Sequence, residues 1–370
     1  MKRILEFKFP FYRFAGLDLC NCYASIYLFL QGVIADNTDY YCQAMTEKSC
    51  NDCWKCADSL QEKSERLNQM FGMIFDGRWT TQRDSWTGEK TKIQKELTGK
   101  YSDFDVKTMQ EMDFLTGFTG YNYNKITKGL KESVISSIDA SNPVIAKLKI
   151  GEIFRVIIGY DGDMLVEPDY RPADNAPDTN NPTSYDEIEY LYVFGKKIPQ
   201  RYSFLDVLKA MENVMGSDFA EGIWYDIKHN VFSGNACDLS VLEVKKRFSR
   251  FYDLMDMMPN RGHSIRLPFG DKDLLKGLGV DVCKYRELVD VIENQGHLLH
   301  ERGYMLMAIS TCIINLSQND ADNFPWDKLG LVNAAEQIFE LLIDCDMQVL
   351  LAIKKAIRQG ESIKVYLDIC

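Results

Sequence analysis

The sequence predicts an α+β unit over residues 1–200, followed by an all-α helical bundle over residues 203–370. Short β-branched runs separated by turn residues occur between residues 143 and 194, which indicates an antiparallel meander. After residue 203 the apolar residues recur at helical spacing instead. Because 370 residues are many for one hydrophobic core, we expect these two regions to form separate domains.

Composition and charge narrow the classes of function. The chain is 46% hydrophobic and 26% charged, as is usual for a soluble globular protein. Its net charge of −11, without a long basic run, argues against binding to nucleic acid or to an anionic membrane. The first ten residues carry charges within their apolar part, so they do not resemble a signal peptide. We therefore expect a cytoplasmic protein without a nucleic-acid or membrane partner.

The first elements surround a short apolar helix. Residues 1–16 are rich in aromatic side chains and predict an edge strand or a packed arm. A helix is expected from Cys22 to Gly32, and it is apolar nearly all round, which predicts burial. The elements expected next are a helix from Trp54 to Phe71, a polar excursion over 76–104, a turn over Phe114–Gly120 and an amphipathic helix over Ile126–Ile138.

The sheet of the first unit is predicted from four short runs. Asp161-Gly-Asp163 has the composition of a hairpin turn, and the Pro-, Asn- and Asp-rich residues 171–184 must form a loop. The expected strands are Pro143–Leu148, Phe154–Tyr160, Met164–Pro168 and Ile188–Phe194.

Five helices are predicted for the second unit, with proline and glycine residues between them. They are Ser203–Met215, Phe219–Val231, Leu239–Met258, Cys283–Leu316 and Leu329–Arg358. The breaks are expected at Pro259, Gly262, Pro268 and Pro325, and a short final strand at Ile363–Leu367.

Three segments of the first unit, in their order and spacing, resemble one protein superfamily. They are Cys20-Asn-Cys-Tyr-Ala-Ser with Leu30-Gln-Gly32, then Asp113-Phe-Leu-Thr-Gly-Phe-Thr-Gly-Tyr121, then Asn142-Pro-Val-Ile with Phe154-Arg-Val-Ile-Ile-Gly-Tyr-Asp-Gly-Asp-Met-Leu-Val-Glu-Pro-Asp169. Together they resemble the papain-like, bacteriocin-leader-peptidase-like superfamily, and in particular the butirosin biosynthesis protein H N-terminal domain and its uncharacterised bacterial relatives. The segment Ser217–Asp226 also resembles the first helix of the helical domain that follows in those relatives.

This resemblance implies a papain-like fold for the first unit and a cysteine nucleophile. Cys20, or else Cys22, matches the nucleophile position at the start of a helix, where the helix dipole favours a thiolate. The family's transferase member implies acyl transfer from a carrier protein, and its peptidase relatives imply cleavage after a double glycine. The implied partner is therefore a peptide, an acyl carrier or a small-molecule ligand. The third family position, which orients a histidine, falls at Glu167 or Asp169.

The histidine that such a nucleophile needs is missing from the first 228 residues. The family position falls at or beside Glu152, and a carboxylate there would disfavour the thiolate. Arg155 could favour a thiolate but cannot act as a base at neutral pH. We therefore predict a catalytically degenerate relative that binds a peptide, an acyl group or a natural-product intermediate. The alternative is an active cysteine acyltransferase or amidohydrolase that uses Cys20 or Cys22 with an unusual base, such as Glu152 or a histidine from the helical bundle.

A second cysteine group gives a third hypothesis, a metal-bearing interaction or regulatory protein. Cys42, Cys50, Cys53 and Cys56 have paired spacing that could hold zinc or an iron–sulfur cluster. Alternatively, Cys53 and Cys56 lie on the buried face of a helix. Apart from this group, no cofactor is expected.

The helical bundle carries all four histidines, His229, His263, His297 and His300. His297 and His300 share one helix face, which allows a metal or an acid–base pair, although solvated or packing side chains are the simpler interpretation. The bundle could also offer a homodimer interface.

Overall fold

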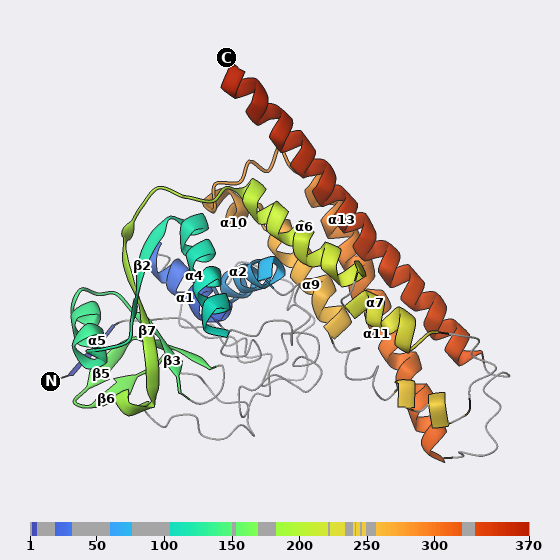
Figure 1. Ribbon diagram of the computed structural model, residues 1–370, viewed down its shortest axis with the longest axis horizontal. Helices are drawn as coiled ribbons and strands as arrows, with labels where there is room; N and C mark the ends of the chain where they lie inside the picture. Colours follow the sequence, from blue (N-terminus) through green and yellow to red (C-terminus); the bar gives the residue numbers. More distant parts are fainter. Residues whose placement is uncertain are drawn as a thin grey trace, which may run out of the picture. The chain divides into compact units, whose positions relative to one another are not determined.

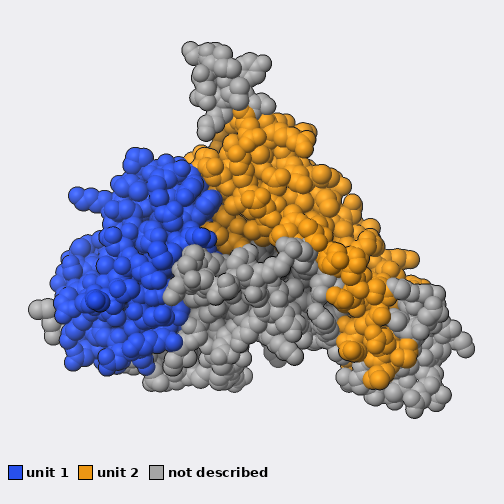
Figure 2. Space-filling model, in the orientation of Figure 1, with its two compact units in different colours: residues 1–71, 82–91, 103–202 blue, residues 72–81, 92–102, 203–370 orange. Residues whose placement is uncertain are grey.

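The computed structural model describes residues 2–5, 19–31, 60–75, 104–149, 153–168, 183–220, 223–233, 240, 242–244, 246–248, 257–319 and 330–369. The fold is mixed α+β, with two antiparallel sheets and a helical C-terminal region. The chain divides into two compact units (Figure 2). Unit 1 comprises residues 1–71, 82–91 and 103–202, and unit 2 comprises residues 72–81, 92–102 and 203–370.

Unit 1 contains a four-stranded sheet and a three-stranded sheet, and all strand pairs are antiparallel. The first has the order β2-β7-β3-β4, with strands at Tyr121–Ile126, Ile188–Lys197, Val144–Leu148 and Phe154–Ile157. The second has the order β1-β5-β6, with strands at Lys2–Ile4, Gly159–Asp161 and Met164–Val166.

One continuous extended segment joins the two sheets. It leaves the four-stranded sheet after β4, passes Ile158 and enters the three-stranded sheet as β5. The hairpin predicted at Asp161-Gly-Asp163 is confirmed, because Asp161 pairs with Met164. Gly162 has φ +62°, a backbone conformation that glycine adopts at little cost.

The helices of this half of the chain are α1 (Leu19–Leu30), α2 (Leu60–Phe75), α4 (Phe104–Thr119) and α5 (Leu130–Asp139). The α1 helix begins before Cys22, so Cys20 lies inside its first turn. Two predictions were wrong. Phe114–Thr119 is not a turn but forms the end of α4, and Gly120 follows it. The predicted helix at Ile126 starts only at Leu130, because Ile126 is the last residue of strand β2.

Unit 2 is built from α6 (Phe204–Ala220), α7 (Ile223–Asn230), α9 (Met257–Gly270), α10 (Lys272–Gly277), α11 (Arg286–Asn319) and α13 (Leu331–Ile369). The long helices α9, α11 and α13 lie side by side (Figure 1). None of the helices that the structure describes is both long and apolar enough to cross a bilayer.

Four predictions about unit 2 were wrong, three helix breaks and one strand. Pro259, Gly262 and Pro268 lie inside α9 rather than between helices. Pro259 is in the first turn, where a backbone N–H has no partner within the helix, so proline is tolerated there. The segment Ile363–Leu367 continues α13 and is not a strand, because helix propagation outweighs the local preference of its β-branched residues.

Two glycines let α9 and α11 approach closely. A Cβ on Gly262 would lie 2.5 Å from the backbone nitrogen of His300 and 2.7 Å from the carbonyl oxygen of Gly296. A Cβ on Gly296 would in turn lie 2.9 Å from Cβ of Arg266. Both positions therefore require glycine, and these contacts set the distance between the two helices.

The interior of unit 2 contains a buried ionic network centred on Arg261 of α9. Its guanidinium donates to Asp346 of α13 through Nε at 3.0 Å and Nη2 at 2.7 Å, and it pairs with Asp218 of α6 at 3.0 Å. Trp224 of α7 donates its indole N–H to Asp346 at 2.7 Å. Burial alone would lower the pKa of Arg261, but Asp346 and Asp218 outweigh it and the pKa is raised. The network therefore holds a charged arginine where four helices meet.

Candidate functional site

The cysteine helix α1 turns one face toward the four-stranded sheet. Cys20, Tyr23 and Tyr27 are three and seven residues apart and therefore share this face. The Tyr23 ring lies 5.6 Å from the Phe194 ring of β7, and the Tyr27 ring lies 6.2 Å from the Tyr121 ring of β2. Cys20 is buried, and it lies on the same side of the helix as these two tyrosines, which pack on the sheet.

The buried hydroxyl of Tyr23 has one well-defined partner, Thr119 of α4. The Thr119 hydroxyl donates to the carbonyl oxygen of Leu115 at 2.8 Å, so Tyr23 must donate to Thr119. Burial raises the pKa of Tyr23 far above its usual range and raises the pKa of Tyr27 to about 12. Both phenols are therefore neutral at physiological pH, and neither can serve as a base for a thiol.

The register of the sheet decides which side chains of β4 face α1. Tyr192 pairs with Ile145, which pairs with Val156, so these three side chains lie on one face. Phe194 also points to this face, because it lies two residues from Tyr192 on the same strand. Since Tyr23 contacts Phe194, the α1 helix covers this face, and β4 packs against α1.

The side chains of β4 on the cysteine side are therefore Phe154 and Val156, and both are fully buried. Arg155 pairs with Ala146 and points to the opposite face of the sheet. The sequence-based expectation that Arg155 could favour a thiolate at Cys20 is thus wrong, because the sheet itself separates its side chain from α1. The described part of β4 offers the cysteine helix only hydrocarbon.

Arg155 has a different partner, Glu167. Its Nε lies 3.4 Å from Glu167 Oε2, and the Thr183 hydroxyl donates to Glu167 Oε1. Burial raises the pKa of the Glu167 carboxyl, although Arg155 and Thr183 act in the opposite direction. Glu167, which with Asp169 was one of the two residues expected at the position that orients a histidine, is held by Arg155 and Thr183.

Other predicted site residues lie outside the part of the chain that the structure describes. These are Glu152, Asp169, Cys42, Cys50, Cys53 and Cys56. The described residues contain no group of three or more His, Cys, Asp or Glu side chains arranged to hold a metal ion. The zinc or iron–sulfur site therefore stays a prediction, which elemental analysis of the purified protein tests directly.

The described histidine side chains all lie in unit 2, at His229 on α7 and at His297 and His300 on α11. Nδ1 of His297 lies 3.3 Å from Nη1 of Arg266, which can only donate, so this nitrogen accepts. The ring of His300 instead packs edge-on against Tyr304. His297 and His300 therefore have separate partners, as expected for solvated and packing side chains.

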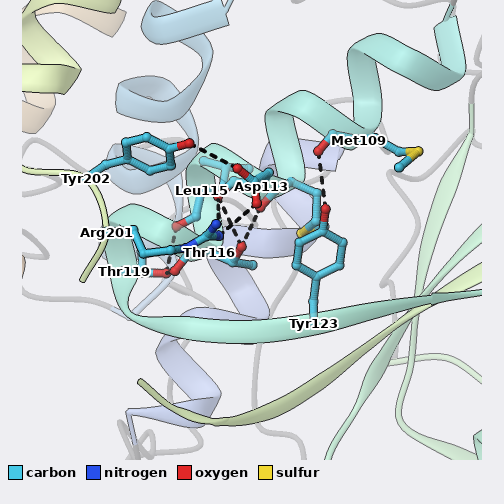
Figure 3. A network of polar contacts seen from close by, with 9 residues as sticks. Met109, Asp113, Leu115, Thr116, Thr119, Tyr123, Arg201 and Tyr202 are labelled. Atoms are coloured by element: carbon cyan, nitrogen blue, oxygen red, sulfur yellow. Dashed lines mark hydrogen bonds and ion pairs between the residues drawn. The ribbon is translucent and has the colours of Figure 1, made fainter. Parts of the chain in front are cut away.

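The second segment of the family resemblance forms a contact site that the sequence did not reveal. Asp113 of α4 accepts from Arg201 Nη2 at 2.8 Å and from the Tyr202 hydroxyl at 3.0 Å (Figure 3). Phe114 stacks on the Tyr202 ring at 4.7 Å. A Cβ on Gly117 would lie 2.5 Å from that ring. This segment of α4 therefore binds Arg201 and Tyr202, the last residues of unit 1.

Gly120 completes this contact. It has φ +80°, and a Cβ there would lie 2.7 Å from the carbonyl oxygen of Ile198. Ile198 N–H donates to the Gly120 carbonyl at 2.8 Å. The spacing of Gly117 and Gly120 was the available signal, because two glycines at the end of a helix allow another segment to pack closely.

Comparison with known proteins adds no assignment to this geometry. No protein-family model matches the chain, and neither the curated proteins nor the solved structures include a significant match.

Proposed function

We propose that this protein is a catalytically silent relative of the papain-like cysteine acyltransferases and peptidases, which binds its ligand without attacking it. The ligand class that the resemblance implies is a peptide, an acyl group on a carrier, or a natural-product intermediate. In this proposal α1 is retained as a scaffold for the fold, and Cys20 and Cys22 are buried thiols of that scaffold.

One observation carries the proposal. The strand β4 presents Phe154 and Val156 to the cysteine helix, and its one charged side chain, Arg155, points to the other face. A thiol is activated by a base within hydrogen-bond reach, or by nearby positive charge. Phe154 and Val156 supply neither and favour the neutral thiol. The buried Lys147 of β3, which pairs with Phe154 and so lies on the same face, donates to the Leu148 carbonyl and to Glu189.

The sequence supports the same conclusion independently. Unit 1 contains no histidine at all, because the first histidine of the chain is His229. The tyrosines beside Cys20 are neutral, since burial raises the pKa values of Tyr23 and Tyr27. The Glu167 carboxyl is engaged with Arg155 and Thr183.

The test uses an acyl thioester of N-acetylcysteamine as a substitute for an acyl carrier. Incubation followed by intact mass measurement and peptide mapping should show no acyl adduct on Cys20 or Cys22. Ligand binding, measured as a rise in melting temperature with the thioester or with its non-hydrolysable ketone analogue, should persist in Cys20→Ala. Cys283→Ala, which alters an exposed thiol of unit 2, is the matched control.

The second candidate is an active cysteine acyltransferase or amidohydrolase. Cys20 lies in the first turn of α1, where the helix dipole favours a thiolate, and this placement supports the candidate. It predicts an acyl adduct that maps to Cys20 and disappears in Cys20→Ala. That adduct would overturn the silent-site proposal, whereas the absence of both an adduct and binding would overturn both candidates.

A further inference from the structure

The helix pair α11 and α13 of unit 2 carries large apolar side chains that leave much of their surface exposed. On α11 they are Leu298 and Met305, and on α13 they are Leu341 and Leu351, each between 37% and 54% exposed. Single exposed apolar side chains are common, but a group on one side of a helix pair is typical of an interaction surface. This surface lies in a different unit from Cys20 and goes beyond the proposed function.

Each of the two helices carries an acid on the same stripe as its exposed apolar residues. On α11, Glu301 lies three residues after Leu298 and four residues before Met305. On α13, Asp344 lies between the two exposed leucines, three residues after the first and seven before the second. Residues three, four and seven apart share one face of a helix, so each stripe has an acid between two apolar side chains.

Two contacts between the helices place both stripes on the same side of the pair. Arg302 of α11 donates to the carbonyl oxygen of Leu341 at 3.0 Å, and Glu287 of α11 pairs with Lys355 of α13. Glu287 lies about three helical turns before Leu298, and Lys355 lies about one turn after the second leucine of the α13 stripe. Because both contacts join one stripe to the other, the two stripes border a common surface.

The charges on this surface that lack an ionic partner are negative. Within the described residues, neither Glu301 nor Asp344 forms an ion pair, and Asp344 accepts only from the Gln348 amide at 3.5 Å. The neighbouring cations are directed elsewhere, because Arg302 reaches inward to the buried sulfur of Cys345 and the Lys355 ammonium is paired on α11. A partner that fits this surface therefore needs apolar side chains together with positive charges.

We propose that this surface binds a basic amphipathic helix of a partner protein. Its apolar face lies along the leucine and methionine side chains of the two stripes, and its lysine or arginine residues pair with Glu301 and Asp344. Helices that dock in this way use anchors three, four and seven residues apart, which is also the spacing of the stripes. The acids oppose an anionic membrane, and they oppose a second copy of this chain, which would bring the same acids to the surface.

The probe is a labelled synthetic helix of about four turns, with leucine on one face and lysine on the other. It is titrated into the full-length protein at physiological ionic strength and followed by fluorescence anisotropy. We expect saturable binding of one peptide per chain. A scrambled peptide of the same composition keeps the charge but has no apolar face, so it should bind about tenfold more weakly or less.

Two results of this titration would overturn the proposal. One is the absence of saturable binding by the amphipathic peptide. The other is equal binding of the two peptides, which would show only the general attraction of a cationic peptide to a chain with a net charge of −11.

Substitution of an apolar residue locates the surface. Met305→Gln should weaken binding of the amphipathic peptide by about five- to tenfold, because it removes an apolar contact. Tyr304→Gln is the matched control, since Tyr304 is similarly exposed but lies about 100° away around α11. Equal losses in the two variants would contradict the assigned surface.

Charge reversal tests the acids separately. Glu301→Lys combined with Asp344→Lys should abolish the preference for the lysine peptide and allow binding of the same helix with glutamate in place of lysine. Asp273→Lys, at an exposed acid of α10, should leave the preference unchanged. A preference that survives the double reversal would contradict the proposal. So would a dimer of the parent protein that Met305→Gln dissociates in sedimentation, because it would assign the surface to a second copy.

Discussion

Beside its cysteine helix, unit 1 buries the hydroxyl pair of Tyr23 and Thr119, whereas unit 2 buries a network of charged side chains between its helices. In unit 1, Tyr23 donates to Thr119 within a layer of aromatic side chains. In unit 2, Arg261 is enclosed with Asp346 and Asp218. The two kinds of buried group differ in the free-energy cost of burial. A buried charge must be matched by charged partners, whereas a buried hydroxyl needs only one hydrogen bond.

The buried charges of unit 2 and the side chains that face α1 in unit 1 have different consequences. The buried charges of unit 2 are paired with one another and join distant helices, which suits a structural role. On the sheet face that α1 covers, β4 presents Phe154 and Val156, and the buried Lys147 of β3 is paired with Glu189. The charged network of unit 2 therefore joins its helices, whereas the face of β4 that packs on α1 carries only Phe154 and Val156.

The largest expected effect on stability comes from the buried Arg261 network of unit 2. Asp346→Asn should lower the free energy of unfolding of unit 2 by about 3–5 kcal/mol, because it leaves Arg261 buried with only part of its counter-charge. Urea denaturation gives the magnitude, and hydrogen exchange with mass spectrometry shows which unit loses protection. The double variant Arg261→Met with Asp346→Leu should be less destabilised than the single variant. A loss below 1 kcal/mol would contradict a central role for the network.

The second effect tests the helix crossing of unit 2. Gly262→Ala should destabilise that unit by about 1–3 kcal/mol, because the new Cβ would meet backbone atoms of α11 that cannot rotate away. Gly216→Ala on α6 is the matched control, since nothing lies within 4 Å of its added Cβ. That variant should gain about 0.5–1 kcal/mol from helix propensity. Equal effects at the two positions would refute the close crossing.

The third expected effect concerns the buried hydrogen bond between Tyr23 and Thr119 in unit 1. Tyr23→Phe should cost about 1 kcal/mol, because it removes one hydrogen bond to Thr119 and introduces no charge. Tyr304→Phe, at an exposed position of α11, should have little effect on stability. A loss of unfolding free energy as large as that of Asp346→Asn would contradict the difference between the two units.

The smallest effect is pH-dependent and concerns Glu167. Its folded pKa is raised above the unfolded value of 4.5, so its contribution to stability is present below that pH and is lost as the carboxyl ionises. The stability of Glu167→Gln relative to the parent protein should therefore rise as the pH is raised above about 4.5. Urea denaturation across this range measures the difference. A relative stability that falls with pH would show that the pair with Arg155 dominates burial.

The sheet was the most predictable part of unit 1. The β-branched runs at Val144 and Phe154 and the Asp161-Gly turn are local signals, and the structure places strands and a hairpin there. Strand β2 was missed although Tyr121-Asn-Tyr-Asn alternates, because its polar residues resemble a loop. The α4 helix was mistaken for a turn because Gly117 and Gly120 serve distant contacts that only the fold reveals.

The candidate site was only partly predictable. The absence of histidine before residue 229 is visible in the sequence, whereas the contacts of Glu167 with Arg155 and Thr183 are not. The face on which Arg155 lies depends on strand register, which no local pattern specifies. The pairing of Arg261 with Asp346 joins residues 85 positions apart, and spacing alone cannot reveal it.

The most direct test of the silent-site proposal is the rate of alkylation of each cysteine as a function of pH. Iodoacetamide labelling of the folded protein, followed by peptide mapping, allows the exposed Cys283 and Cys312 to serve as internal references. We predict that Cys20 reacts more slowly than both references at every pH, and that urea removes the difference. A Cys20 that reacts faster than both at about pH 6 would demonstrate an activated thiolate and contradict the proposal.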